Sequence, residues 1–332
     1  LFFGYWFDKD NFGPYMREHR MKKTLYSMKK NGKTYKFANK RNYYGFRGDE
    51  LDPSEINGVM VGGSTTAERY KPEKFTIVSL LNKKFNKENI NIKIANAGIE
   101  GQSTLGHIAN FKYWFPKLNK FNPEFIIFYV GINDVFKNVN TAPDALEIFD
   151  AHDGFILNPD KNEVFKDNIR SRSIIYDSLR RIKHKFYEGN EKKRITLDFD
   201  NLFKKNLKKK YLNFEQKTKT YNVENILENY DTEIRKYIDN IDELAKYSQS
   251  IGAIPIFVNQ AAQRTYITKE LYALNISLIN HCKKQNYKCV NLAKKINATS
   301  IFWWDGIHTT PETSKKIAEI IFPELKSFLE IN

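Results

Sequence analysis

The chain has 332 residues and 41% hydrophobic content, which is enough to bury the core of one large domain or two modest ones and excludes disorder throughout. The two cysteines, Cys282 and Cys289, are too few for a disulfide framework and lack the paired spacing of a zinc site, so both are predicted to be buried thiols. The net charge of +15 is concentrated in two segments, which excludes a uniformly basic fold, and no apolar run is long enough to span a membrane.

Residues 1–50 are predicted to be a basic and aromatic N-terminal extension, because no alternation of strands and helices is recognisable there. The opening stretch "LFFGYWF" is typical both of a segment at a membrane interface and of an ordinary packing segment. Residues 17–41 carry ten lysine or arginine residues against one acidic residue. The chain does not begin with Met, so we expect a preceding anchor that would make the protein membrane-associated or extracytoplasmic.

From residue 51 to residue 332, apolar strands alternate with amphipathic helices, as in a parallel sheet that is covered on both faces. Short apolar runs predict five strands, at residues 58–63, 91–98, 125–131, 253–260 and 287–293. Helices are predicted at residues 74–87, 103–119, 223–250, 268–285 and 311–329. The expected fold is therefore a three-layer α/β/α sandwich with a five-stranded parallel sheet.

Residues 140–222 interrupt this alternation and are predicted to be an insertion. Because so long a segment leaves the carboxyl end of a strand, we expect a lid, a partner surface or a flexible segment. Within it, residues 180–219 carry fourteen basic residues against five acidic ones. Both basic segments suit contact with a membrane surface or an acidic polysaccharide, although lysine-rich stretches are more often simply solvated surface.

Four short motifs lie where the predicted strands end or just before the last helix. The motif "GGST" contains Ser64, "NAGIEGQS" contains Gly98, and "GIND" contains Asn133. The loop "WWDGIHTT" contains Asp305 and His308. Since the carboxyl ends of parallel strands meet at one edge of a sheet, these residues are expected to share one face of the protein.

These residue types supply what nucleophilic catalysis by serine requires. Asp305 and His308 are close enough in the chain for the carboxylate to bind one imidazole nitrogen while the other faces Ser64. The Ser64 backbone N–H, the Gly98 N–H and the Asn133 side-chain amide are predicted to form an oxyanion hole. Each motif alone has a structural alternative, such as a helix cap, a turn or a loop hydrogen bond, and the agreement of all four favours catalysis.

The four motifs resemble those of the SGNH hydrolases, also called the GDSL family, over about residues 56–325 without the insertion. Ser64 matches the nucleophile block, Gly98 the second block, Asn133 the third, and Asp305 with His308 the last. The resemblance implies a flavodoxin-like fold and hydrolysis of an ester, often an acetyl ester of a carbohydrate or a lipid acyl ester, without a cofactor or a metal. The sequence departs from the family pattern beside the nucleophile, where Gly63 replaces an aspartate and Thr65 replaces a leucine.

The expected function is a serine esterase with a small-molecule or glycan ester as substrate. An O-acyltransferase that uses the same triad is the main alternative, and a non-catalytic phosphate- or nucleic-acid-binding protein is a more distant one. The corner at Ser64 lacks the lysine of a phosphate-binding loop and no nucleic-acid-reading motif is present, so a nucleic-acid partner is not expected.

Trp303 and Trp304 are candidates for stacking on the substrate, with buried packing as the alternative. The other five histidines are predicted to be surface or packing residues.

Overall fold

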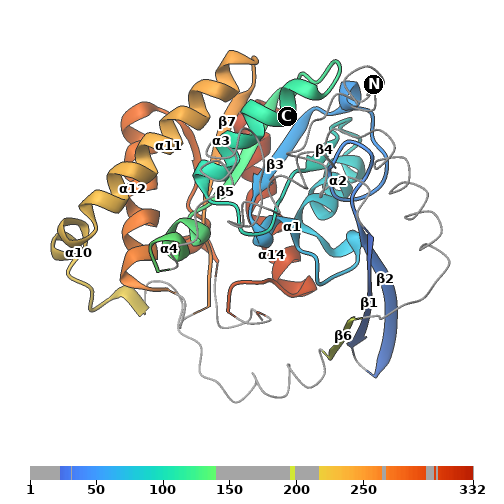
Figure 1. Ribbon diagram of the computed structural model, residues 1–332, viewed down its shortest axis with the longest axis horizontal. Helices are drawn as coiled ribbons and strands as arrows, with labels where there is room; N and C mark the ends of the chain where they lie inside the picture. Colours follow the sequence, from blue (N-terminus) through green and yellow to red (C-terminus); the bar gives the residue numbers. More distant parts are fainter. Residues whose placement is uncertain are drawn as a thin grey trace, which may run out of the picture.

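Five parallel strands form the main sheet in the computed structural model, in the order β4-β3-β5-β7-β8 (Figure 1). This is the strand order of the flavodoxin-like fold, so the predicted fold class is confirmed. The strands are β3 (Gly58–Gly62), β4 (Ile94–Asn96), β5 (Phe125–Val130), β7 (Ile254–Asn259) and β8 (Lys288–Val290). The structure describes residues 23–30, 32–139, 195–198, 217–263, 267–296, 303 and 306–331.

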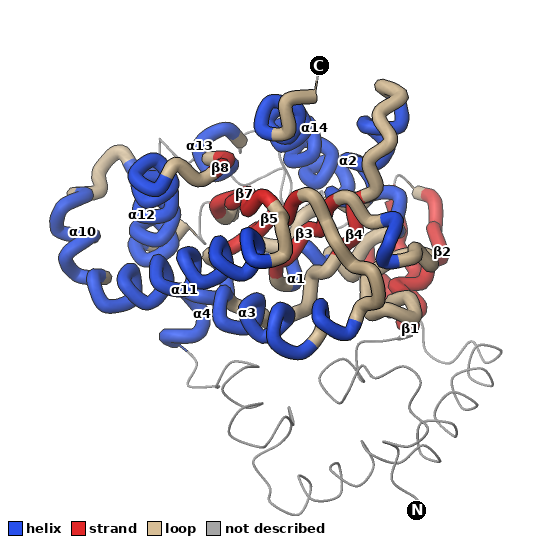
Figure 2. Tube along the Cα trace, turned by 90° about the horizontal axis from the view of Figure 1, so that it is seen from above, coloured by secondary structure: helices blue, strands red, loops and turns tan. Residues whose placement is uncertain are grey.

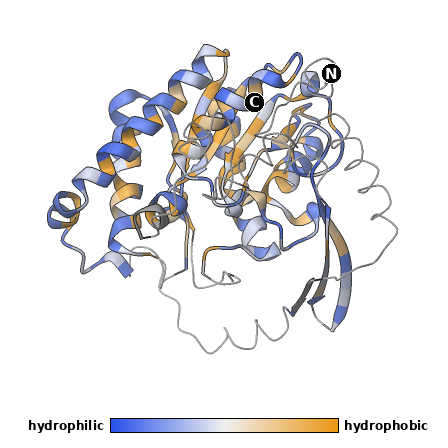
Figure 3. Cartoon of the chain, viewed as in Figure 1, coloured by the Kyte–Doolittle hydropathy of each residue, from blue (hydrophilic) through white to orange (hydrophobic). Residues whose placement is uncertain are grey.

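The strands are almost continuously apolar because both faces of the sheet are covered. Every residue of β3 and β5 is buried. Alternate side chains enter two separate cores: Val59 and Phe128 face one, and Met60 and Ile127 face the other. Figure 3 shows the apolar residues gathered on the sheet and on the helix surfaces that face it.

Helices cover the two faces and complete the three layers (Figure 2). One face packs against α3 (Thr104–Tyr113), α11 (Asp231–Ser250) and α12 (Lys269–Gln285). The other packs against α2 (Ile77–Lys87) and α14 (Pro311–Phe328). The shorter helices are α1 (Ser64–Ala67), α4 (Ile132–Val139), α10 (Val223–Asn229) and α13 (Leu292–Lys295).

Helix ends differ from the prediction where local chemistry stops or starts a helix. The predicted helix 103–119 ends at Tyr113 and continues as a 3-10 turn, η4 (Phe115–Lys117), because Pro116 has no N–H to donate and restricts the residue before it. The predicted helix 223–250 is divided at Tyr230 into α10 and α11. Thr310 caps α14 by accepting a hydrogen bond from the Thr313 N–H, and Pro311 follows as the first residue of the helix, where a missing N–H is tolerated.

A second, smaller sheet joins the N-terminal extension to the insertion. Strands β1 (Lys23–Lys30) and β2 (Lys33–Lys40) are antiparallel, and β6 (Ile195–Asp198) pairs with β1 in parallel. Figure 1 shows this sheet at the side of the molecule, away from the main sheet. The sequence pattern did not predict any of these strands. The division into residues 1–50 and 51–332 remains a prediction, but Phe46 lies in the main core and the Arg47 N–H donates to the Asn96 carbonyl at 2.9 Å.

The two cysteines form a disulfide bond, so the prediction of two buried thiols is wrong. Cys282 lies in the last turn of α12, and Cys289 lies in β8. Between them, Asn286 adopts a left-handed conformation that ends the helix and turns the chain back. This reversal brings the two sulfur atoms together, although sequence spacing alone did not indicate it.

Reduction of this disulfide is expected to lower the free energy of unfolding by about 2 kcal/mol, because a short closed loop restricts the unfolded chain. The measurement is urea denaturation of the wild type with and without dithiothreitol. The double variant Cys282→Ser, Cys289→Ser is the control, since a reductant should not change its stability. A wild type that is insensitive to reductant would contradict the disulfide.

Candidate active site

Ser64 lies on the corner between β3 and α1, at the carboxyl edge of the main sheet. It is the first residue of α1 and is partly exposed. The Asn133 amide of α4 packs so closely against Gly63 that a Cβ at residue 63 would lie 2.1 Å from Asn133 Nδ2. Gly63, the residue before Ser64, therefore leaves the space that the Asn133 side chain occupies.

His308 contacts the hydroxyl of Ser64 directly. Its Nε2 atom lies 2.8 Å from Ser64 Oγ, although the two residues are 244 positions apart in the chain. At this distance the hydroxyl can donate its proton to the imidazole. The ring of Tyr70 packs edge-on against the imidazole, with 5.6 Å between the centroids.

The loop that carries His308 is attached to the main sheet through its backbone. The Gly306 carbonyl accepts a hydrogen bond from the Gln263 N–H at 2.7 Å, just beyond the end of β7. Gly306 has a φ of 115°, a conformation that favours glycine. Thr309 forms an antiparallel bridge with Trp303.

Two of the predicted site residues in this loop, Trp304 and Asp305, lie outside the described residues. Trp303 is described, and it is 1% exposed and belongs to the hydrophobic core on the α2 and α14 side of the sheet. Its side chain therefore anchors the loop, which corresponds to the packing alternative and corrects the expectation of a stacking surface for substrate. The assignment of Asp305 as the partner of His308 remains a prediction.

The residues of the three predicted oxyanion donors are in contact with the start of α1 or belong to it: Asn133 packs against Gly63, and Gly98 packs against the backbone of Thr66 and Ala67. The Ser64 N–H is at the first position of a helix, where there is no intrahelical acceptor. Asn133 Nδ2 donates one hydrogen to the Gln102 carbonyl at 2.8 Å and has a second hydrogen to offer. The Gly98 N–H donates to Asn96 Oδ1 at 3.0 Å, so it must change partner before it can bind an oxyanion.

Gly98 also sets the distance between the loop after β4 and α1, the helix that begins at Ser64. A Cβ at residue 98 would lie 2.3 Å from the backbone nitrogen of Ala67 and 2.7 Å from the carbonyl carbon of Thr66. Both atoms belong to the backbone of α1, so they cannot move without moving the helix that begins at Ser64. Only glycine fits here.

Gly98→Ala is therefore expected to reduce kcat for an aryl acetate by ~10²-fold, because a displacement of about 1 Å at a catalytic group has an effect of this size. Overpacking should also lower the free energy of unfolding by about 1–3 kcal/mol. Steady-state kinetics and urea denaturation measure the two effects. Gly101→Ala is the matched control, because among the described residues a Cβ there meets no atom within 4 Å, and its cost should be limited to strain at a φ of 80°.

Two other described histidines, His107 and His281, lie in surroundings typical of residues that support the fold. His107 is 1% exposed, and burial lowers its pKa to about 3, so it is neutral and packs beside Gln102. His281 Nε2 lies 2.7 Å from the Asp242 carboxylate, a partner that sequence spacing did not reveal. Within the described ranges no group of three histidine, cysteine or acidic residues could hold a metal ion.

The sequence patterns did not predict the burial of the charged residues that follow α1. Glu68 and Lys71 follow α1 and are buried together, and the side chain of Arg47 reaches the same turn from the N-terminal segment. In the sequence, "AERYKPEKF" is typical of an exposed, charged turn. No local signal separates a buried pair from a solvated one, because the burial comes from residues more than 200 positions away.

A parallel α/β sandwich with a serine–histidine pair at its carboxyl edge has the fold and the arrangement of a serine hydrolase. No protein-family model and no curated protein matches the chain. Solved structures that are similar to it include TesA, with 13% identity and a TM-score of 0.47 over 81% of this chain and 98% of that chain. The psychrotrophic esterase EstA from Pseudoalteromonas sp. has 14% identity and a TM-score of 0.46 over 82% and 99% of the two chains. A GDSL-like lipase from Bacteroides thetaiotaomicron has 12% identity and a TM-score of 0.42 over 84% and 92%.

Across the described residues no helix is both long and apolar enough to cross a bilayer.

Proposed function

We propose that this protein is a serine esterase that hydrolyses an acyl ester through a covalent intermediate on Ser64. The observation that carries the proposal is the 2.8 Å contact between His308 Nε2 and Ser64 Oγ. A hydroxyl paired with an imidazole at the carboxyl edge of a parallel sheet is a nucleophile with its general base. Asn133 and the N–H of Ser64 supply donors beside that hydroxyl.

The reaction follows from this arrangement. Ser64 Oγ attacks the carbonyl carbon of the ester while its proton passes to His308 Nε2. The carbonyl oxygen becomes an oxyanion and accepts hydrogen bonds from the Ser64 N–H and the Asn133 amide, with the Gly98 N–H as the third proposed donor. When the tetrahedral intermediate collapses, His308 gives the proton to the departing alcohol, and the acyl group remains on Ser64. Water then attacks the acyl-enzyme with His308 again as base, which releases the acid.

Asp305 is proposed to hold His308 in the tautomer that leaves Nε2 free to accept the proton from Ser64. The acyl group is proposed to be acetyl, and the alcohol is proposed to be a carbohydrate hydroxyl. These finer assignments are supported by the sequence resemblance to SGNH hydrolases and by the order of the motifs.

A panel of esters tests the proposal. Aryl acetate, acetylated sugars and longer acyl esters are incubated with the wild type and with Ser64→Ala, and the released acid and the products are quantified. We expect the wild type to release acetate faster than longer acids. A panel in which no ester is cleaved would refute the esterase. Transfer of the acyl group to an added glycan, in place of release as free acid, would identify the O-acyltransferase alternative.

The basic segments 17–41 and 180–219 are proposed to bring the enzyme to an acidic polysaccharide or to a membrane surface. Strands β1 and β2 contain part of the first segment, and they carry the six lysines Lys23, Lys29, Lys30, Lys33, Lys36 and Lys40. Sedimentation with acidic polysaccharide or anionic vesicles at low and high salt tests this contact, because an electrostatic contact weakens as salt rises.

A further inference from the structure

A buried ion pair lies directly after the nucleophile helix, in the turn between α1 and the 3-10 turn η3 (Glu73–Phe75). Lys71 Nζ contacts Glu68 Oε1 at 2.7 Å, and both side chains are 1% exposed. Because burial removes the hydration of both ions, an apolar pair of similar volume is often at least as stable in such a position. Stability alone is therefore a poor explanation for this pair.

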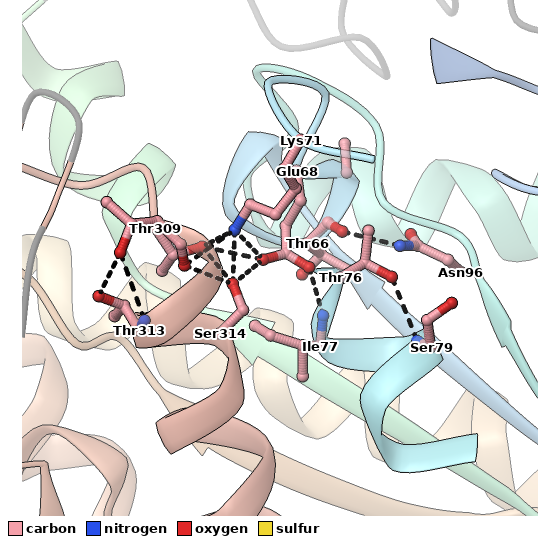
Figure 4. A network of polar contacts seen from close by, with 12 residues as sticks. Thr66, Glu68, Lys71, Thr76, Ile77, Ser79, Asn96, Thr309, Thr313 and Ser314 are labelled. Carbon is pink, nitrogen blue, oxygen red and sulfur yellow. Dashed lines mark hydrogen bonds and ion pairs between the residues drawn. The ribbon is translucent and has the colours of Figure 1, made fainter. Parts of the chain in front are cut away.

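Both members of the pair are bound by the segment that follows His308 (Figure 4). Glu68 Oε1 accepts hydrogen bonds from Thr309 Oγ1 at 2.8 Å and from Ser314 Oγ at 2.5 Å. Lys71 Nζ donates to Thr309 Oγ1 at 2.6 Å and also to Ser314 Oγ. The ion pair thus holds the start of α14 and the residue next to His308 through the same two hydroxyl groups.

The network is a second connection between the nucleophile and its base. The Glu68 N–H donates to the Ser64 carbonyl at 2.8 Å and so closes the nucleophile helix. Glu68 has a φ of 47°, a left-handed conformation that costs about 1–2 kcal/mol in a residue with a Cβ. From Ser64 the connection runs through the Glu68 carboxylate to Thr309 and then along one peptide unit to His308.

The turn that carries the pair is itself fixed from outside. The Arg47 guanidinium donates to the carbonyls of Ala67 and Lys71, and it pairs with Glu73 at 2.7 Å. Glu68 Oε2 also accepts from the first N–H of α2, at Ile77, at 2.5 Å. The Glu68 carboxylate therefore cannot shift toward or away from α14 without loss of several of these bonds.

We propose that Glu68 and Lys71 are positioning residues that hold His308 at proton-transfer distance from Ser64. The proposal rests on the proposed esterase function. The pair touches neither the ester nor the reacting atoms, so its removal should change the rate of proton transfer and leave substrate binding unchanged. In kinetic terms, kcat falls and KM is retained.

The ionisation of Lys71 provides a signature of this role. Burial is the main cause that lowers the pKa of Lys71, Glu68 opposes it, and Arg47 and Glu312 make smaller contributions of opposite sign, so that the pKa is about 8. Above about pH 8 the ammonium loses its proton and the network loses its ion pair, so kcat is expected to fall. The unfolded chain binds this proton more tightly than the folded protein, so the contribution of Lys71 to the free energy of unfolding rises with pH over the same range. Activity and this stability contribution therefore move in opposite directions.

The test is the double variant Glu68→Gln, Lys71→Met, which removes both charges and leaves no single buried ion. For an aryl acetate we expect kcat to fall by ~10²-fold with KM unchanged, as for a small displacement of a catalytic group. The decrease of kcat above about pH 8 should be absent from this variant. Enzyme concentration is set by the folded fraction from circular dichroism, so that a loss of folded protein is not counted as a loss of rate.

Two control variants separate positioning from stability. Glu55→Gln, Lys93→Met removes an exposed ion pair of the same 2.7 Å length and should leave kcat unchanged. Leu81 is a core residue of α2, and Leu81→Ala opens a cavity in the hydrophobic core. It should lower the free energy of unfolding by about 2–5 kcal/mol with kcat per folded molecule retained. If the Glu68–Lys71 double variant behaves like Leu81→Ala, the pair has only a structural role and the proposal is wrong.

A crystal structure of the double variant decides the proposal independently of activity. We expect His308 Nε2 to lie beyond hydrogen-bond distance of Ser64 Oγ. An imidazole in its original place would overturn the positioning role, even if the variant were less active. A wild type that cleaves no ester would refute the proposed function but not the positioning role. The crystal structure of the double variant would still show whether the ion pair holds His308 beside Ser64.

Discussion

Ser64→Ala is expected to lower kcat for ester hydrolysis by ~10⁶-fold and to leave the fold intact. The hydroxyl is the only atom group removed, and it is the group that lies 2.8 Å from His308 Nε2. Loss of the nucleophile alone has an effect of this size where serine and histidine act as a unit. Alanine is also well accepted at the first position of a helix, so circular dichroism and thermal unfolding should match the wild type.

Covalent labelling provides the second measurement for this variant. An organophosphonate should add once to the wild type, on the peptide that contains Ser64, and should not add to Ser64→Ala. Ser250→Ala is the matched control, because Ser250 is an exposed serine whose hydroxyl donates to the Tyr247 carbonyl and should not affect labelling. Labelling that persists in Ser64→Ala at another residue would show that the nucleophile has been misassigned.

Asp305→Asn is expected to lower kcat by ~10⁴-fold with little change in KM. An amide in place of the carboxylate favours the imidazole tautomer that carries its proton on Nε2. That nitrogen could then no longer accept the proton of Ser64. The measurement is the steady-state rate with aryl acetate between pH 6 and 10, together with phosphonate labelling of Ser64, which should slow in parallel.

An asparagine in place of an exposed aspartate is the control for this variant. Asp231 pairs with Arg235 on the surface of α11, so Asp231→Asn should leave kcat unchanged. Near-normal activity of Asp305→Asn would reject the role assigned to this residue. The search for the partner of His308 would then turn to other acidic residues.

The main sheet was predictable because its signals are local. The apolar runs at residues 58–63 and 125–131 have no alternation of polar side chains, which is the pattern of strands that are buried on both faces. Glycine and polar residues directly after these runs placed Ser64 and Asn133 at the carboxyl edge. The pairing of Ser64 with His308 was predicted from residue types and motif order. The distance between the two side chains could not be predicted from the sequence.

Other features could not be read from the sequence because they depend on distant pairing. Strand β6 of the insertion pairs with β1 of the N-terminal extension, and neither segment carries a pattern that identifies the other. Cys289 meets Cys282 only because Asn286 turns the chain back. The sequence is compatible both with stacking and with packing of Trp303, and only the structure shows that it is buried in the core.

By itself, therefore, the sequence determined the layered α/β architecture and the identity of the nucleophile and base candidates, since strand periodicity and short motifs act over a few residues. Only the tertiary structure decided which charges are buried and which polar groups meet. Glu68 and Lys71 have the local pattern of a solvated turn, and they become a buried network because Thr309 and Ser314 are folded against them from the other end of the chain. Burial depends on how the whole chain packs, and local residue patterns carry little information about it.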